Sequence, residues 1–98
     1  MVIHVKRLVY DPHRVKHMWI KHRVTEEEVK EVIKNKHFVR HGNVRHIIIL
    51  GQTGEGLVLD VVFESKGKGK YYLLTAYDAY RELVSFFKKK GGDLNEKE

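Results

Sequence analysis

Histidine, lysine and arginine dominate the side chains of this sequence that could do chemistry. The chain has seven histidines and 19 lysines and arginines, but no cysteine. Imidazoles exchange protons near neutral pH, and cationic side chains bind anionic oxygens. A cysteine nucleophile, a disulfide and a thiolate zinc site are all excluded. The residue types therefore favour acid–base chemistry on an anionic substrate.

His22 is the best acid–base candidate because of its position in a helical pattern. It ends an apolar stripe in which Val15, Met18 and Trp19 precede it at i, i+3 and i+4, with the histidine at i+7. This spacing puts the imidazole at the border between core and surface, where it could donate or accept a proton. The alternative is a structural histidine that hydrogen-bonds to backbone at the edge of the core.

Arg45 is the best candidate for binding a phosphate. It precedes an apolar run, and we expect it to alternate with Ile47 and Ile49 along one strand. A guanidinium there could clamp a phosphate through two hydrogen bonds. The alternative is a cross-strand salt bridge to Asp60 or Glu64.

The histidines also raise the question of a metal site. His13 and His17 are spaced i, i+4 and would share a helix face, but no HExxH motif is present. His37 and His41 lie in a segment whose conformation the sequence does not fix. This spacing alone does not define a zinc site, so we expect no metal and no other cofactor.

The net charge points to a polyanionic partner. The formal charge is +6, and residues 91–98 carry three acidic side chains against one lysine, which leaves +8 on the rest of the chain. A basic field of this kind attracts nucleic acid first and other anionic surfaces second. A solvated basic surface is the alternative. Charged residues make up 33% of the chain and Gln52 is the only glutamine, a bias that hints at a thermophilic source.

The length and apolar content predict a single small domain. The chain has 98 residues, of which 42% are hydrophobic, and no linker divides it. We expect one domain over residues 1–90 and a polar, disordered tail over residues 91–98. The longest apolar run is Ile47 to Leu50, so neither a membrane-spanning helix nor a signal peptide fits, and we expect a cytoplasmic protein.

The first part of the chain predicts a strand followed by two helices. Residues 2–10 mix β-branched and charged side chains, which suits an edge strand. Asp11 and Pro12 then form a helix start, in which the carboxylate caps the backbone and the proline occupies the first turn. Thr25 and Glu28 form a capping box that opens the second helix.

The second part predicts three strands and a last helix. The strands are expected over residues 44–50, 57–63 and 71–76, joined by glycine-rich turns into an antiparallel meander. Asp78 is expected to cap a helix that ends at Gly91, with Tyr80, Leu83, Val84 and Phe87 as its buried stripe. The order β-α-α-β-β-β-α predicts an α+β domain, with helices packed on a small antiparallel sheet.

Several blocks of this sequence resemble a known family. Residues 21–29, KHRVTEEEV, resemble the "KHGVSFEEA" segment of BrnT-type toxins. Three further blocks resemble that family's "R…IG", "L.VVF" and "ISAR" segments in the same order: Arg45 to Gly51, Leu57 to Phe63, and Leu74 to Ala76. The similarity covers roughly residues 10–91 and rests on the order and spacing of the blocks.

The resemblance implies a RelE-like fold and a small ribonuclease, neutralised by a partner antitoxin with a ribbon-helix-helix DNA-binding domain. Two positions depart from the family pattern: Arg23 replaces a glycine, and Tyr77 replaces the arginine that closes the "ISAR" block. A tyrosine could still donate a hydrogen bond to phosphate or stack on a base.

Our first hypothesis is a metal-independent endoribonuclease. Its catalytic candidates are His22, Arg45, Lys21 and Tyr77, and its further RNA contacts are Lys6, Arg7, Lys16 and Arg23. The second hypothesis is a non-catalytic module that binds RNA or protein and derives from such a toxin, which the change at Tyr77 favours. A purely structural or interaction protein is the third, since no single motif decides between these classes. Lys21 could be plain solvated surface, and Tyr77 could simply pack beside the last helix.

Overall fold

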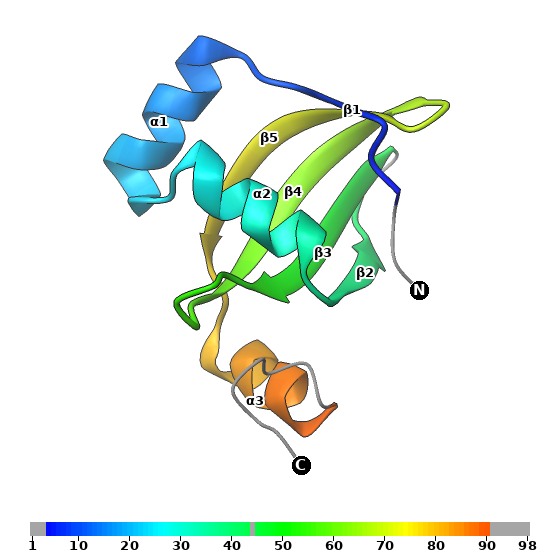
Figure 1. Ribbon diagram of the computed structural model, residues 1–98. Coiled ribbons are helices and arrows are strands. Elements are labelled where there is room, and N and C mark those ends of the chain that lie inside the picture. The colour runs from blue at the N-terminus through cyan, green and yellow to red at the C-terminus, as the bar shows by residue number, and fades with distance from the viewer. Residues whose placement is uncertain (1–3, 44, 91–98) are drawn as a thin grey trace.

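A five-stranded sheet with helices on both faces forms the frame of the computed structural model, which describes residues 4–43 and 45–90 (Figure 1). The elements in chain order are β1 (Arg7–Val9), α1 (Pro12–His22), α2 (Glu26–Lys34), β2 (His37–His41), β3 (His46–Gln52), β4 (Val58–Gly67), β5 (Lys70–Asp78) and α3 (Arg81–Lys89). The expected α+β architecture is confirmed, and β2 adds a strand to the predicted order.

The strands lie in the order β1-β5-β4-β3-β2. From β2 to β5 each strand pairs with the next in antiparallel fashion, as the predicted meander requires. The short strand β1 is different because it pairs with β5 in parallel, with Leu8 opposite Tyr71. It ends at Val9, so that within the described residues β5 has no strand neighbour on that side beyond Tyr72. This open edge of β5 faces α1.

The predicted starts of the first two helices are confirmed. The Asp11 carboxylate accepts a hydrogen bond from the His13 backbone N–H at 2.9 Å, and Pro12 is the first helical residue. In the capping box, the Glu28 N–H donates to the Thr25 hydroxyl, and the Thr25 N–H donates to the Glu28 carboxylate. These contacts are local, and they need no help from the rest of the fold.

The start of α3 differs from the prediction. Asp78 is the last residue of β5, where it pairs with Leu59, and Tyr80 takes the N-cap position without a side-chain hydrogen bond. Tyr80 is 70% exposed rather than buried, whereas Phe87 is fully buried. The ladder with β4 carries the chain further as a strand than local signals suggest. The predicted helix end at Gly91 and the predicted tail lie outside the described residues.

Two apolar clusters lie on opposite faces of the sheet. The larger cluster packs Met18 of α1 and Val32 of α2 against alternate residues of the strands, including Ile49 and Leu59. The smaller cluster packs Phe87 of α3 against Leu50 and Val58. These two residues are neighbours of Ile49 and Leu59 along their strands, so they face the opposite side of the sheet. No helix in the described part of the chain is long and apolar enough to cross a membrane.

Candidate functional site

A groove runs between α1 and the open edge of β5. It consists of two adjoining hollows of about 520 and 570 Å³ that share Lys21, His22 and Thr75. We call it the α1–β5 groove. Its walls are His13, Arg14, His17, Lys21 and His22 of α1, Leu74, Thr75, Tyr77 and Asp78 of β5, and Tyr80 beyond β5.

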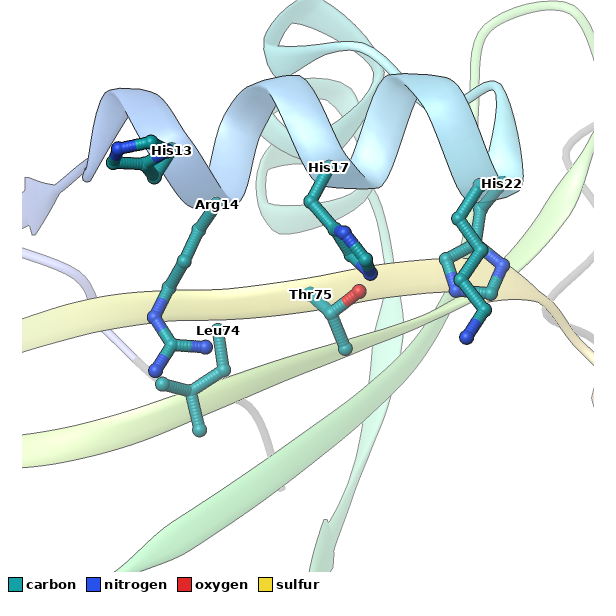
Figure 2. A pocket seen from close by; sticks show the side chains of 7 residues that line it. His13, Arg14, His17, His22, Leu74 and Thr75 are labelled. Carbon is teal, nitrogen blue, oxygen red and sulfur yellow. The ribbon is translucent and has the colours of Figure 1, made fainter.

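The α1 wall of the groove is cationic. Arg14, His17 and Lys21 follow at i, i+3 and i+7, a spacing that puts them on one face of the helix. Figure 2 shows Arg14 and His17 reaching from α1 towards Leu74 and Thr75 of β5. The ion pairs found among the described residues involve neither Arg14 nor Lys21, so both charges are available to a ligand.

His22 meets Tyr77 where the two hollows join. Their ring centroids are 5.7 Å apart and the ring planes are inclined by 53°. His22 is half-buried, at the border of core and surface that the helical spacing predicts. The helix ends there because Arg23 adopts the left-handed conformation, with φ 59°, and its N–H donates to the Trp19 carbonyl. An imidazole and a phenol thus share one end of a cationic groove.

A buried carboxylate lies behind Tyr77 in the sheet. Asp60 of β4 is 2% exposed, pairs with Tyr77 across the ladder, and accepts a hydrogen bond from the Arg40 guanidinium at 2.5 Å. Burial raises the pKa of the Tyr77 phenol, the Asp60 charge raises it further, and Arg40 opposes that rise. Tyr77 therefore remains a hydrogen-bond donor to higher pH than an ordinary tyrosine.

Sequence reasoning missed Arg40 because it did not assign the strand that carries it. The sequence did contain one signal for such a cationic partner, because Asp60 is an acidic residue flanked by apolar neighbours in a strand. A carboxylate in such a place requires a partner. Arg45 was the alternative partner for Asp60 or Glu64 that the sequence offered, whereas the structure pairs Asp60 with Arg40.

Arg45 does not lie on a strand, so that expectation is wrong. It occupies the turn between β2 and β3 with φ 69°, and its carbonyl accepts a hydrogen bond from the Ser65 N–H. Ser65 is five residues from Asp60 along β4, a distance of about 17 Å. The structure therefore brings together Lys21, His22 and Tyr77, and it puts Arg45 near the other end of the sheet. The role of Arg45 in RNA binding stays a prediction.

The four further RNA contacts predicted from the sequence are all exposed, and none lines the groove. Lys16 precedes Lys21 by five residues, which rotates it about 140° around the helix axis. The Arg23 guanidinium lies over the Trp19 ring, 5.1 Å from its centroid. Lys6 and Arg7 lie at the β1 edge, where both backbone N–H groups donate to the Gly69 carbonyl. Their contacts with RNA stay predictions.

His13 and His17 lie on the groove side of α1, but they lack a third ligand. Within residues 4–43 and 45–90, no group of three or more histidines and carboxylates is placed to hold a metal ion. Two imidazoles alone form only half of a tetrahedral zinc site. The pair is better described as part of the cationic wall.

Comparison with solved structures finds the ribonuclease toxin BrnT of Brucella abortus. Its crystal structure matches with a TM-score of 0.65 over 76% of this chain and 97% of that chain, at 12% sequence identity. The chain has the BrnT fold. The fold expected from the BrnT-like sequence blocks is thereby confirmed. No family model matches this sequence, and no curated protein matches it.

Proposed function

We propose that this protein is a toxin-like endoribonuclease that cleaves RNA without a metal in the α1–β5 groove. The observation that carries the proposal is the contact of His22 with Tyr77, 5.7 Å between ring centroids, in a groove with a cationic wall. The same fold occurs in a ribonuclease toxin, which supports the reaction class.

The reaction would use the RNA's own 2′-hydroxyl. Its oxygen attacks the adjacent phosphorus, the bond to the 5′-oxygen breaks, and the products are a 2′,3′-cyclic phosphate and a 5′-hydroxyl. His22 accepts the proton of the attacking hydroxyl. The leaving 5′-oxygen takes a proton from the Tyr77 hydroxyl, and the proton held by His22 then returns to the phenolate through water, so that both groups regain their starting states. The Lys21 ammonium offsets the negative charge that develops on the phosphoryl oxygens.

The other predicted contacts act at a distance from the scissile phosphate in this proposal. Arg45 binds RNA beyond the reacting nucleotide, because it lies about 17 Å along the sheet. Lys6, Arg7, Lys16 and Arg23 add to the field that attracts RNA. Their contribution is to affinity and association rate rather than to chemistry.

We propose that the protein is cytoplasmic and that its protein partner is an antitoxin with a ribbon-helix-helix domain. The support comes from the BrnT-like sequence blocks and from the outer side of α1. Trp19 is 46% and Ile20 is 58% exposed there. Large apolar side chains beside cations suit a protein partner with acidic and apolar groups.

A non-catalytic RNA-binding module is the alternative. The observation that favours it is Tyr77, which stands where the resembled family has an arginine. A phenol carries no positive charge, so the groove has one cation fewer beside His22. In this alternative, the cationic wall binds RNA and no bond is cleaved.

The deciding experiment is cleavage of an end-labelled RNA in excess chelator by the wild-type protein, His22→Ala and Arg45→Ala. We expect His22→Ala to lower the cleavage rate by about 10²- to 10⁴-fold, the usual contribution of a general acid–base group. Arg45→Ala should weaken RNA binding and leave the rate at saturating RNA near that of wild type, since it lies far from His22.

Each other outcome has a defined meaning. Equal rates for wild type and His22→Ala would assign the activity to a contaminant or to other residues. Binding of RNA by wild type without cleavage would select the non-catalytic alternative. A 2′,3′-cyclic phosphate end, detected by mass spectrometry, is the product that the proposed reaction requires.

A further inference from the structure

One end of the α1–β5 groove is not used by the proposed chemistry. His22, Lys21 and Tyr77 lie where the two hollows meet, and the remaining α1 wall extends from them towards the start of the helix. We infer that His13, Arg14 and His17 form a second phosphate-binding subsite, so that the groove holds an extended single strand of RNA. This inference rests on the proposed function for the location of the scissile phosphate.

The charges at this subsite fit a phosphate. No carboxylate is among the residues that line this hollow, and all three basic side chains are exposed. The nearest acid along the chain, Asp11, is already engaged: one oxygen accepts the His13 backbone N–H, and the other accepts the Tyr72 hydroxyl at 3.2 Å. A guanidinium without an acidic neighbour can bind a phosphate through two hydrogen bonds.

The dimensions of the groove fit more than one phosphate. His13 and His22 are nine residues apart on a straight helix, which corresponds to about 13 Å along its axis. One phosphate bound at His22 leaves most of that length free. The hollow at the subsite, about 520 Å³, has the volume of a small-molecule site, which leaves room for part of a single strand. Single strands bind in cationic grooves of this kind.

A metal ion is the competing ligand for His13 and His17. Arg14 lines the same hollow, and its charge repels a cation. The described residues also provide no third protein ligand. Thr75 and Leu74 form the opposite wall and offer no carboxylate. The composition of the hollow therefore favours an anion.

The test uses single-stranded 2′-O-methyl oligonucleotides, which lack the attacking hydroxyl, so that binding is measured without cleavage. We expect Arg14→Ala and His17→Ala each to weaken binding of a hexanucleotide severalfold, and the double variant about tenfold or more. The slope of log affinity against log salt should fall by about 0.7 if one phosphate contact is lost. A dinucleotide with a single phosphate should bind all these variants and wild type nearly equally.

Lys16→Ala is the matched control, because it removes a charge from the same helix on the side away from the groove. All the substituted side chains are exposed, so folding should be preserved, and circular dichroism checks this. Losses no larger than that of Lys16→Ala, or an unchanged salt slope, would overturn the subsite. If RNA is cleaved but Arg14→Ala does not weaken binding, the proposed function holds without the subsite. If Arg14→Ala weakens binding of the hexanucleotide but not of the dinucleotide, and no RNA is cleaved, the subsite holds without the proposed function.

Discussion

Tyr77 is the residue on which the choice between catalysis and binding depends. Tyr77 lines the groove together with His22, and its ring makes the contact between them. Tyr77→Phe keeps the ring and removes only the hydroxyl. We expect single-turnover cleavage to fall by about 10²- to 10⁴-fold, as for loss of a general acid. RNA affinity should change little, and a full-rate Tyr77→Phe would remove the phenol from the mechanism.

The ionisation of Tyr77 can be measured directly. Because burial and Asp60 raise its pKa, the folded protein holds this proton more tightly than the unfolded chain does. The resulting stabilisation is present below the ordinary tyrosine pKa of about 10, and it is lost as the pH rises through the folded-state value. The phenolate absorbance of wild type minus that of Tyr77→Phe should therefore titrate above pH 10. A difference curve centred at or below pH 10 would contradict the assigned environment.

Arg40 stabilises the sheet behind the groove by neutralising Asp60. Arg40→Leu would leave a carboxylate that is 2% exposed without its partner. We expect a loss of about 2 kcal/mol in urea unfolding, less than the roughly 3–5 kcal/mol for a fully buried pair, because the Arg40 side chain is 40% exposed. The double variant Arg40→Leu, Asp60→Asn should recover much of this loss. No recovery would mean that the arginine acts through packing instead.

At the scale of elements, α1 positions the groove wall and Asp11 positions α1. Asp11→Ala removes the N-cap of this helix and the acceptor of the Tyr72 hydroxyl. We expect a loss of about 1–2 kcal/mol and slower cleavage, because α1 carries Lys21 and His22. Thr25→Ala is the matched control: it uncaps α2, which carries no groove residue, and costs about 1 kcal/mol. Equal cleavage by the two variants would show that the cap of α1 serves stability alone.

The helix starts could be predicted from the sequence because capping is local. Asp11 with Pro12, and Thr25 with Glu28, satisfy backbone groups within a few residues. The strand β2 could not be predicted, because HFVRH has charged or titratable side chains at three of its five positions. It forms a strand because β3 offers a complete ladder of backbone partners to it. Tertiary pairing decided the conformation there, as it did at Asp78.

The positive φ of Arg45 explains why its location was also beyond prediction. Glycine and asparagine are the residues that signal such a turn, and Gly42 and Asn43 stand just before it. An arginine with φ 69° gives no such signal. The strand was therefore expected to begin at residue 44, two residues earlier than β3 does.

At the scale of the molecule, the candidate site exists only because of the sheet order. Lys21 and His22 are more than fifty residues from Tyr77 in the sequence, and they meet because α1 packs on β5. The helical stripe predicted the location of His22, and the BrnT-like blocks drew attention to Tyr77. Their contact also requires β1 to stop short, so that the edge of β5 stays open to α1. No local pattern contains that information.

At the same scale, the two apolar clusters on opposite faces of the sheet are joined through the strands that they share. Phe87 is fully buried against Leu50 and Val58, which alternate with Ile49 and Leu59 of the larger cluster. Since both clusters share β3 and β4, they should unfold together. Phe87→Ala should lower the free energy of unfolding by about 3–5 kcal/mol in a single urea transition, while Tyr80→Ala, at a position 70% exposed, should cost little. Two separate transitions would show instead that α3 unfolds independently of the sheet.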